Sequence, residues 1–212
     1  MTLAQQYWDY VFLLNLGKCV DEPLDNLKVQ KITFISEDRA RQEDRLKAAN
    51  FPFFRYNQGP YSKELATAVN ALESLGFIDP ETRQPTERGL YLLDYVQEFV
   101  DQSTPAQRAL RILEETCKKF RNVKSSKLVD TVYEMRVPVA QYNGQIMKVR
   151  DIPKCVDIIL PGSENLSDFS LFPPEALEEL REEFSLTPED LNPKNPDNIA
   201  LARERLNAAL AT

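Results

Sequence analysis

The side chains that could do chemistry in this chain are carboxylates and thiols, because the sequence contains no histidine. The absence of histidine excludes Ser/His/Asp and Cys/His nucleophilic catalysis, His-ligated zinc sites and imidazole proton transfer. Paired carboxylates need no histidine for general acid and base catalysis, and adjacent glutamates occur at 114–115, 178–179 and 182–183. These pairs belong to polar helical faces rather than to an apolar cleft. The sequence therefore predicts no catalytic residue, and we expect a protein that is not an enzyme.

The three cysteines, Cys19, Cys117 and Cys155, are far apart in the sequence. They form no CxxC motif, so their spacing indicates neither a zinc knuckle nor a redox dithiol. We expect Cys117 and Cys155 to be buried apolar side chains. The six glycines form no GxGxxG motif and no P-loop, which are the usual backbone sites for nucleotide phosphates. We expect no cofactor and no metal site.

The composition is that of a globular protein. Hydrophobic residues make up 42% and charged residues 28% of the 212 residues, which excludes a largely disordered chain. The odd number of cysteines favours a reducing compartment, and Asp9 interrupts the apolar stretch at the N-terminus, unlike a signal peptide. No apolar run approaches the ~20 residues needed to cross a bilayer. We expect a cytoplasmic protein with no membrane partner.

The net charge of −7 is unevenly distributed along the chain. Residues 108–154 contain eleven basic and five acidic residues, whereas residues 161–212 contain eleven acidic and four basic residues. A Pro-Gly-Ser sequence marks the change in composition. We predict an α-rich domain over residues 1–160 and an acidic, proline-containing, helical C-terminal extension over residues 161–212.

Apolar residues spaced three and four apart predict a mainly α fold with small β-hairpin elements. The expected helices span residues 3–17, 24–41, 62–75, 90–100, 104–120, 126–135, 151–160, 175–184 and 198–210. The first helix should be amphipathic, and the charged run at residues 37–41 should be a solvated continuation of the second. Residues 51–56 form an aromatic, extended segment, and Asn143-Gly144 predicts the turn of a small hairpin. Ser62 and Thr104 are the expected N-caps of two helices.

Residues 62–100 have the pattern of the second half of a winged helix-turn-helix. A helix is followed by Phe77-Ile78, a polar tip over residues 79–85 and a second helix that begins after Thr86. The helix over residues 62–75 would then hold the recognition position. It offers one lysine against two glutamates, so it is poorly suited to contact DNA phosphates.

Residues 28–35 read Lys-Val-Gln-Lys-Ile-Thr-Phe-Ile, and residues 53–62 read Phe-Phe-Arg-Tyr-Asn-Gln-Gly-Pro-Tyr-Ser. This pairing resembles the Panacea domain family, which contains the SocA-like antitoxins and their relatives. Family members typically have a Lys-Leu-Gln-Lys-Leu-Leu-Tyr-Phe type helix. An aromatic strand follows that ends in Gly-Pro, with another helix directly behind it. Thr33 departs from the family pattern, which has an apolar residue at this position.

The resemblance covers about residues 3–100, and residues 127–133 are similar to a later helix of the family, whereas residues 161–212 show no family pattern. It implies an α-rich domain with a winged-helix-like core that acts by binding another protein. Relatives neutralise a toxin encoded beside them, and one branch delivers its toxin to a protease. No cofactor or catalytic residue comes with the family. The resemblance thus implies an antitoxin whose partner is a toxin encoded nearby.

The candidate partner-binding residues surround the Gly-Pro turn and are Arg55, Tyr56, Tyr61, Ser62 and Lys63. The amphipathic ring of Tyr61 could anchor a partner, or it could equally cover the edge of the core. Strand periodicity places Phe54 and Tyr56 on one face and Phe53 on the other, which indicates either burial on both sides or an exposed aromatic patch. Core packing is the default interpretation of these rings.

A purely structural interpretation of the same motif also remains open. Gly59-Pro60 can position the following helix and do nothing else, because proline fixes φ and glycine accepts either sign of φ. We expect Gln30 to form hydrogen bonds inside the fold, while Lys28 and Lys31 stay in solvent.

Two other functions are consistent with the sequence. A winged-helix transcriptional regulator would contact phosphates through the basic residues 108–154, where five cations lie between Lys118 and Lys127. Solvated charge on helix surfaces, or an acidic extension folded against this stretch, would explain the same residues. The other alternative is an adaptor that presents a client protein to a protease.

Overall fold

The structure is a computed structural model, and it describes residues 2–20, 22–160 and 172–185. The helices of this part are α1 (Leu3–Lys18), α2 (Asn26–Asp44), α3 (Lys63–Ser74), α4 (Glu87–Gln102), α5 (Thr104–Phe120), α6 (Ser125–Glu134) and α7 (Pro174–Ser185). The strands are β1 (Phe53–Tyr56), β2 (Gly59–Tyr61), β3 (Arg136–Val139), β4 (Gln145–Lys148) and β5 (Asp157–Ile159). The predicted mainly α fold with small β elements is confirmed. None of the described helices is long and apolar enough to span a membrane.

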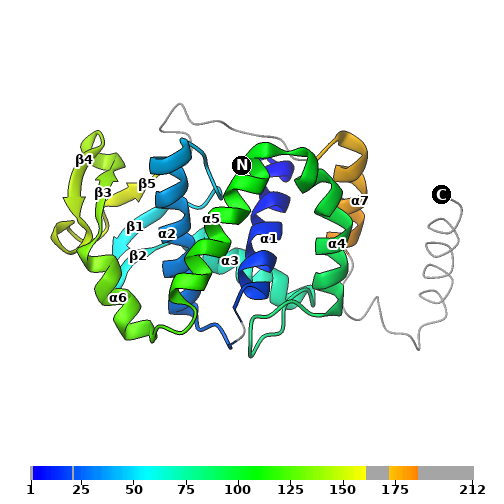
Figure 1. Cartoon of the computed structure of the whole chain (residues 1–212), viewed down its shortest axis with the longest axis horizontal. Coiled ribbons are helices and arrows are strands. Elements are labelled where there is room, and N and C mark those ends of the chain that lie inside the picture. Colours follow the sequence, from blue (N-terminus) through cyan, green and yellow to red (C-terminus); the bar gives the residue numbers. More distant parts are fainter. Residues whose placement is uncertain (1, 21, 161–171, 186–212) are drawn as a thin grey trace, which may run out of the picture.

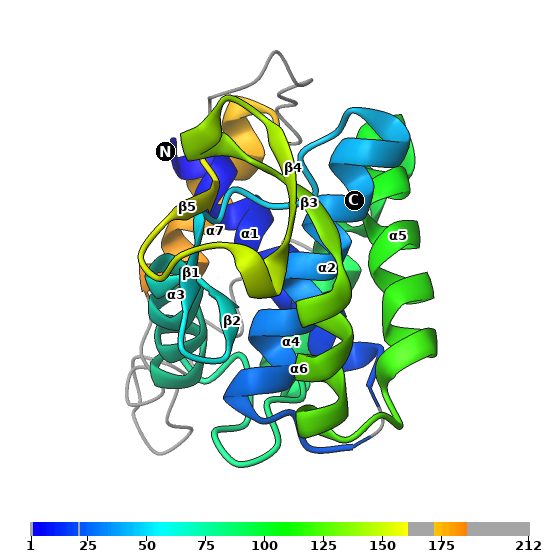
Figure 2. The same cartoon turned by 90° about the vertical axis from the view of Figure 1, so that its left-hand side faces the viewer.

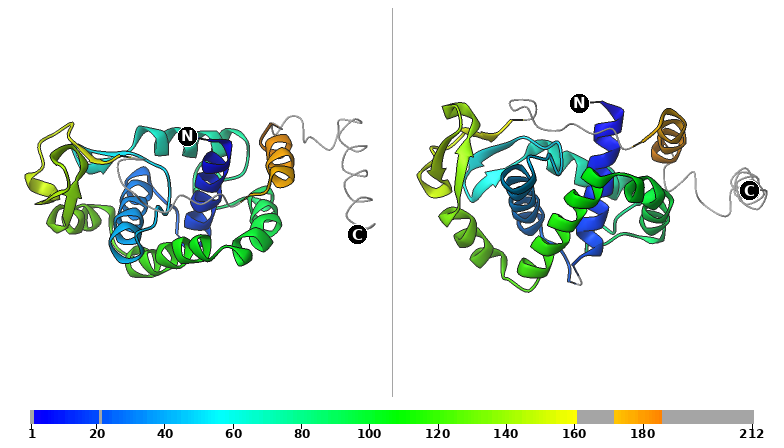
Figure 3. Two further views of the ribbon diagram at one scale, coloured as in Figure 1. Left: turned by 90° about the horizontal axis from the view of Figure 1, so that it is seen from above. Right: turned by 45° about the horizontal axis from the view of Figure 1, so that its top comes forward.

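The two small sheets lie at one end of an elongated molecule, and α4 and α7 lie at the other end (Figures 1 and 3). One sheet has the strand order β2-β1-β5 and the second is the β3–β4 hairpin, both antiparallel. Figure 2 looks onto this end, with the β3–β4 hairpin and α6 nearest the viewer. Helix α2 packs against β2, α5 and α6, so it joins the sheets to the helical body.

Helix α1 crosses the middle of the molecule and is buried on almost every side. Every residue from Tyr7 to Leu14 is buried, because α3, α4, α5 and α7 all contact this helix. The predicted range was close, but the prediction of an amphipathic helix was wrong. Trp8 shows why, since this indole lies inside the core and donates from Nε1 to the Ala48 carbonyl at 2.8 Å.

The charged run in the second half of α2 is largely internal, so the expectation of a solvated segment was wrong. Glu37 and Asp38 are buried. The Glu37 carboxylate accepts hydrogen bonds from Arg41 Nε at 2.7 Å and from the Ala49 backbone N–H at 2.9 Å. Burial raises the pKa of Glu37, and Arg41 opposes that rise. The segment that follows α2 therefore contacts this charged face directly, through Ala49.

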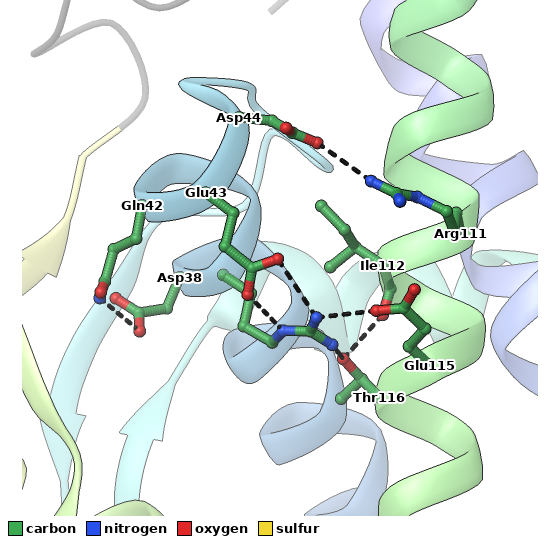
Figure 4. A network of polar contacts seen from close by, with 9 residues as sticks. Asp38, Gln42, Glu43, Asp44, Arg111, Ile112, Glu115 and Thr116 are labelled. Carbon is green, nitrogen blue, oxygen red and sulfur yellow. Dashed lines mark hydrogen bonds and ion pairs between the residues drawn. The ribbon is translucent and has the colours of Figure 1, made fainter.

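The other side of the same helix carries an exposed polar network with α5 (Figure 4). Arg39 contacts Glu43 at 2.8 Å and Glu115 of α5 at 2.8 Å, and Arg111 of α5 lies 3.6 Å from Asp44. One helix therefore holds an internal ion pair on one face and solvated pairs on another.

The segment after residue 151 was predicted as a helix, and this prediction was wrong. Its last residues form β5, which pairs with β1 through Phe53 opposite Ile159 and Phe54 opposite Asp157. The β-branched residues Val156, Ile158 and Ile159 are buried there, because β1 offers a free edge that local sequence does not reveal. The predicted hairpin is confirmed: β3 pairs with β4, and Asn143 and Gly144 turn between them with positive φ.

Ser62 caps α3 as predicted, since its hydroxyl accepts from the Leu65 N–H at 3.1 Å. The polar tip between α3 and α4 holds a single isolated bridge, from Ile78 to Pro85, rather than two strands. The N-cap of α5 is Ser103 rather than Thr104, which shifts the predicted cap by one residue.

Helix α7 matches the extension helix predicted over residues 175–184, and it packs against α1 and α4. The Phe184 ring stacks on Tyr7 with centroids 4.8 Å apart and lies 4.9 Å from the ring of Phe77. Glu183 pairs with Arg88 of α4 at 2.9 Å. This part of the extension therefore packs on the helical body rather than against residues 108–154. The helix predicted over residues 198–210 lies outside the described residues.

Asp9 is a buried carboxylate within α1. Its Oδ1 accepts from the backbone N–H of Asn50 at 2.8 Å and from Nδ2 of Asn50 at 3.0 Å. Oδ2 has no hydrogen-bond partner among the described residues. Burial raises the pKa of Asp9 to about 7, and the nearby charge of Glu37 adds to the rise.

This pKa predicts a specific dependence of stability on pH. The folded carboxyl keeps its proton up to about pH 7, whereas the unfolded one loses it near pH 4. The stability that Asp9 contributes is therefore complete below pH 4 and is lost as the pH rises through 7. Asp9→Asn removes the titrating carboxyl, so between pH 5 and pH 8 its free energy of unfolding should rise by about 2 kcal/mol relative to that of wild type. Urea unfolding at each pH measures this difference. Asp94→Asn, at an exposed site on α4, is the control and should show the same dependence of stability on pH as wild type. The same dependence in Asp9→Asn would contradict the raised pKa of Asp9.

Candidate partner-binding site

The two segments that carry the family resemblance pack directly on each other. The Gln30 side-chain amide exchanges two hydrogen bonds with the Ser62 backbone: Nε2 donates to the carbonyl at 2.9 Å, and Oε1 accepts from the N–H at 2.8 Å. The amide thus pairs with the backbone just beyond β2 as a neighbouring strand would. The prediction that Gln30 bonds inside the fold is confirmed.

Lys28 and Lys31 are buried as well, so the expectation that both stay in solvent was wrong. Lys31 Nζ donates to the Pro60 carbonyl at 2.6 Å, and Lys28 Nζ donates to the Arg121 carbonyl at 2.9 Å. Burial lowers the pKa of Lys31 to about 8, and the positive charge of Arg55 adds to this effect. Side chains of α2 therefore cover the outer edge of β2, which would otherwise present unpaired backbone groups.

The turn predicted at Gly59-Pro60 lies instead at Asn57-Gln58, and the Gly-Pro pair forms the start of β2. Gly59 has φ of +94°, a conformation that favours glycine, and the stem of Lys31 lies directly beside it. The start of β2 therefore places the Pro60 carbonyl against Lys31, and Ser62 follows β2 directly as the N-cap of α3.

Two of the five candidate residues, Arg55 and Ser62, are buried. Arg55 Nε donates to the Val149 carbonyl at 3.2 Å, and its guanidinium lies 4.9 Å from the centre of the Tyr133 ring. Its backbone N–H donates to the Val156 carbonyl at 2.8 Å. Arg55 thus connects β1 to α6 and to the segment before β5. Both residues position the surface rather than form it.

Tyr56 and Tyr61 form a partly exposed aromatic cluster with Phe54. The centroids of Tyr56 and Tyr61 are 5.6 Å apart, and each lies within 6 Å of the Phe54 ring. Tyr56 is 46% exposed. Phe53 points to the opposite face, where it is buried against Phe34 with centroids 5.3 Å apart. The predicted alternation is confirmed: one face of β1 packs in the core and the other carries the aromatic patch.

A cleft of about 430 Å³ adjoins this cluster, between the first turns of α2 and the β1–β2 turn. Its described lining residues are Asn26, Leu27, Gln30, Lys31, Tyr56, Asn57, Gln58, Gly59 and Tyr61. Four of them carry amide side chains, two are tyrosines, and the single charged group, Lys31, is engaged by the Pro60 carbonyl. Such a lining suits an uncharged segment with hydrogen-bonding groups and an aromatic or aliphatic anchor. Asn57 and Gln58 lie within the segment that resembles the family, but the sequence did not indicate them as binding residues. It did not indicate Asn26 and Leu27 either.

Lys63, the last candidate, is exposed on the first turn of α3. It lines a separate cavity of about 210 Å³, which also contacts Asp9 of α1. The structure therefore brings Tyr56 and Tyr61 together on a surface that Arg55 and Ser62 hold from inside. Lys63 lies beside a different cavity.

Part of the charge in the basic stretch is balanced within the fold. Lys118 pairs with Glu114 at 2.7 Å, and Arg111 lies 3.6 Å from Asp44. On the proposed recognition helix α3, Glu73 pairs with Arg83 at 3.3 Å. Other cations of the basic stretch, such as Lys119, Lys124 and Lys127, are exposed.

Cys155 is exposed, which contradicts its predicted burial, whereas Cys117 is buried as predicted. Within the part of the chain that the structure describes, no group of three or more His, Cys, Asp or Glu residues is placed to hold a metal ion. Comparisons of the chain with protein-family models, with curated proteins and with solved structures gave no match.

Proposed function

We propose that this protein is a Panacea-like antitoxin, which binds and neutralises a toxin protein encoded nearby. The observation that carries the proposal is the partly exposed Tyr56–Tyr61 cluster beside a cleft of about 430 Å³, at the point where the two family-like segments meet. Tyrosines with partly exposed rings beside a cleft are typical anchors of protein interfaces. The proposal places both proteins in the cytoplasm.

The buried contacts around the cleft support a binding role because they hold the surface before a partner arrives. Lys31 and Gln30 tie α2 to β2 and to the residue that follows it, and Arg55 ties β1 to α6. A surface that is already ordered loses less conformational entropy on binding, which leaves more of the contact energy as affinity. The partner segment should be uncharged and pack an aromatic or aliphatic side chain against the two tyrosines.

The experiment combines a growth test with a binding measurement. Each neighbouring gene product is expressed alone and together with this protein, and a toxic product that becomes harmless on co-expression identifies the partner. Tyr56→Ala combined with Tyr61→Ala should weaken binding by at least about 100-fold, because two interface anchors are lost. Calorimetry measures the affinity, and circular dichroism checks that the variant is folded.

Tyr91→Ala provides a matched control, since this tyrosine is 67% exposed on α4, at the opposite end of the molecule. It should neutralise the partner as wild type does. Full neutralisation of the toxin by the double variant would show that the cleft does not bind the toxin. If no neighbouring gene product is toxic, the antitoxin proposal is wrong. A shorter lifetime of the toxin in the presence of this protein would indicate delivery to a protease instead of blocking.

A further inference from the structure

A groove of about 310 Å³ lies between α4 and α7, at the end of the molecule opposite the sheets (Figure 1). Its apolar lining consists of Leu92 and Leu180, which are both buried, and of the rings of Tyr91 and Tyr95. Tyr91 is the most exposed large hydrophobic side chain that the structure describes, and its neighbour Leu90 is 41% exposed. Tyrosine rings beside a partly apolar groove are typical anchors of protein interfaces. This α4–α7 groove therefore has the form of a docking surface.

Three carboxylates from α7 complete the lining of the groove, those of Glu179, Glu182 and Glu183. Glu183 is paired with Arg88, whose Nε lies 2.9 Å from its carboxylate. Glu179 accepts a hydrogen bond from the Tyr95 hydroxyl. Among the described residues, no cation pairs with Glu179 or with Glu182. The groove thus holds two negative charges that the described part of the fold does not balance.

The helices on both sides of the groove are acidic. Helix α4 contains four acidic residues and one basic residue, and α7 contains five acidic residues and one basic residue. The basic residue of α4 is Arg88, which Glu183 already engages. A surface of one sign attracts segments of the opposite sign and repels segments of the same sign. The groove therefore favours a cationic partner and disfavours nucleic acid, whose phosphates both helices repel.

We propose that the α4–α7 groove is a second interaction surface of this protein, and that it binds a basic, partly apolar segment of another protein. An aliphatic side chain of that segment packs on Leu92 and Leu180. An arginine or lysine beside it lies over the Tyr91 ring, where the face of the ring attracts a cation. The carboxylates of Glu179 and Glu182 supply the opposite charge for this cation.

This surface is separate from the cleft of the proposed antitoxin function. The cleft adjoins the β1–β2 turn, which lies at the other end of the molecule (Figures 1 and 3). Tyr91→Ala should weaken the binding of basic segments and leave the neutralisation of the toxin unchanged. The same variant therefore distinguishes a failure of one proposal from a failure of the other.

The test uses the full-length protein and a fluorescent synthetic peptide in which arginine and leucine alternate with serine. Fluorescence anisotropy should show saturable binding of this arginine peptide. A peptide with glutamate in place of arginine should bind at least about 100-fold more weakly, because repulsion replaces attraction. A peptide with serine in place of leucine should bind at least about 10-fold more weakly, because it lacks the apolar contact.

Two double variants locate the binding site. Glu179→Gln combined with Glu182→Gln should weaken binding of the arginine peptide by at least about 10-fold. Asp94→Asn combined with Asp101→Asn is the matched control, since it removes two charges from α4 at positions that do not line the groove. The control should change the affinity by less than about 2-fold at physiological salt, which screens distant charges. Circular dichroism shows whether each variant is folded.

Equal losses of affinity in the two double variants would show only a general attraction between opposite charges and would overturn the proposal. Equal binding of the arginine and glutamate peptides by the wild-type protein would overturn it as well. Light scattering tests a second copy of this chain as the occupant, and we expect a monomer. A dimer that Glu179→Gln with Glu182→Gln dissociates would show that the groove binds a second copy instead of another protein.

Discussion

Glu37→Ala is expected to lower the free energy of unfolding by about 3–5 kcal/mol, the cost of removing one partner from a buried ion pair. Glu37 is fully buried, and its carboxylate binds both Arg41 and the Ala49 backbone N–H. Its removal leaves the Arg41 guanidinium in the interior without this counter-charge and the Ala49 N–H without its acceptor. Both groups then bear a desolvation cost that the native carboxylate offsets. Urea unfolding at neutral pH measures the change.

Glu43→Ala is the matched control, since Glu43 lies on the same helix and pairs with Arg39 in the solvated network of Figure 4. That carboxylate is about half-exposed, so its loss should cost less than about 1 kcal/mol. Equal costs for the two alanine variants would show that the charged run of α2 is solvated after all.

Gly89→Ala should destabilise the protein by roughly 2–4 kcal/mol, although the same change at an open helical position is usually stabilising. A Cβ on Gly89 would lie 2.2 Å from the Phe77 carbonyl oxygen and 3.1 Å from Leu14 Cδ2. The nearer atom belongs to the backbone, so α4 would have to move away from the segment after α3. Thermal unfolding measures the cost as a lower melting temperature.

Asp94→Ala on the same helix, at an exposed position, should change the stability by less than about 0.5 kcal/mol. A neutral or stabilising Gly89→Ala would mean that α4 can shift freely relative to Phe77. In that case the close approach does not hold the helix in place.

Local patterns predicted the elements well, because the signals that start and stop helices and turns lie within a few residues of each other. Ser62 capped α3 as expected, Asn143-Gly144 turned the β3–β4 hairpin, and helical spacing located α7. The alternation of β1 also placed Phe53 and Tyr56 on opposite faces, although it left open which of these faces is buried. Each of these predictions needed only the residues of its own element.

The larger errors involved contacts between elements that are distant in the sequence. Glu37 is buried where Ala49 of the next segment contacts it, and β5 is a strand because β1 offers it an edge. Lys31 is buried because the Pro60 carbonyl binds it. Periodicity and caps report how a segment folds, whereas burial, charge pairing and reactivity depend on the neighbours that the fold brings to it.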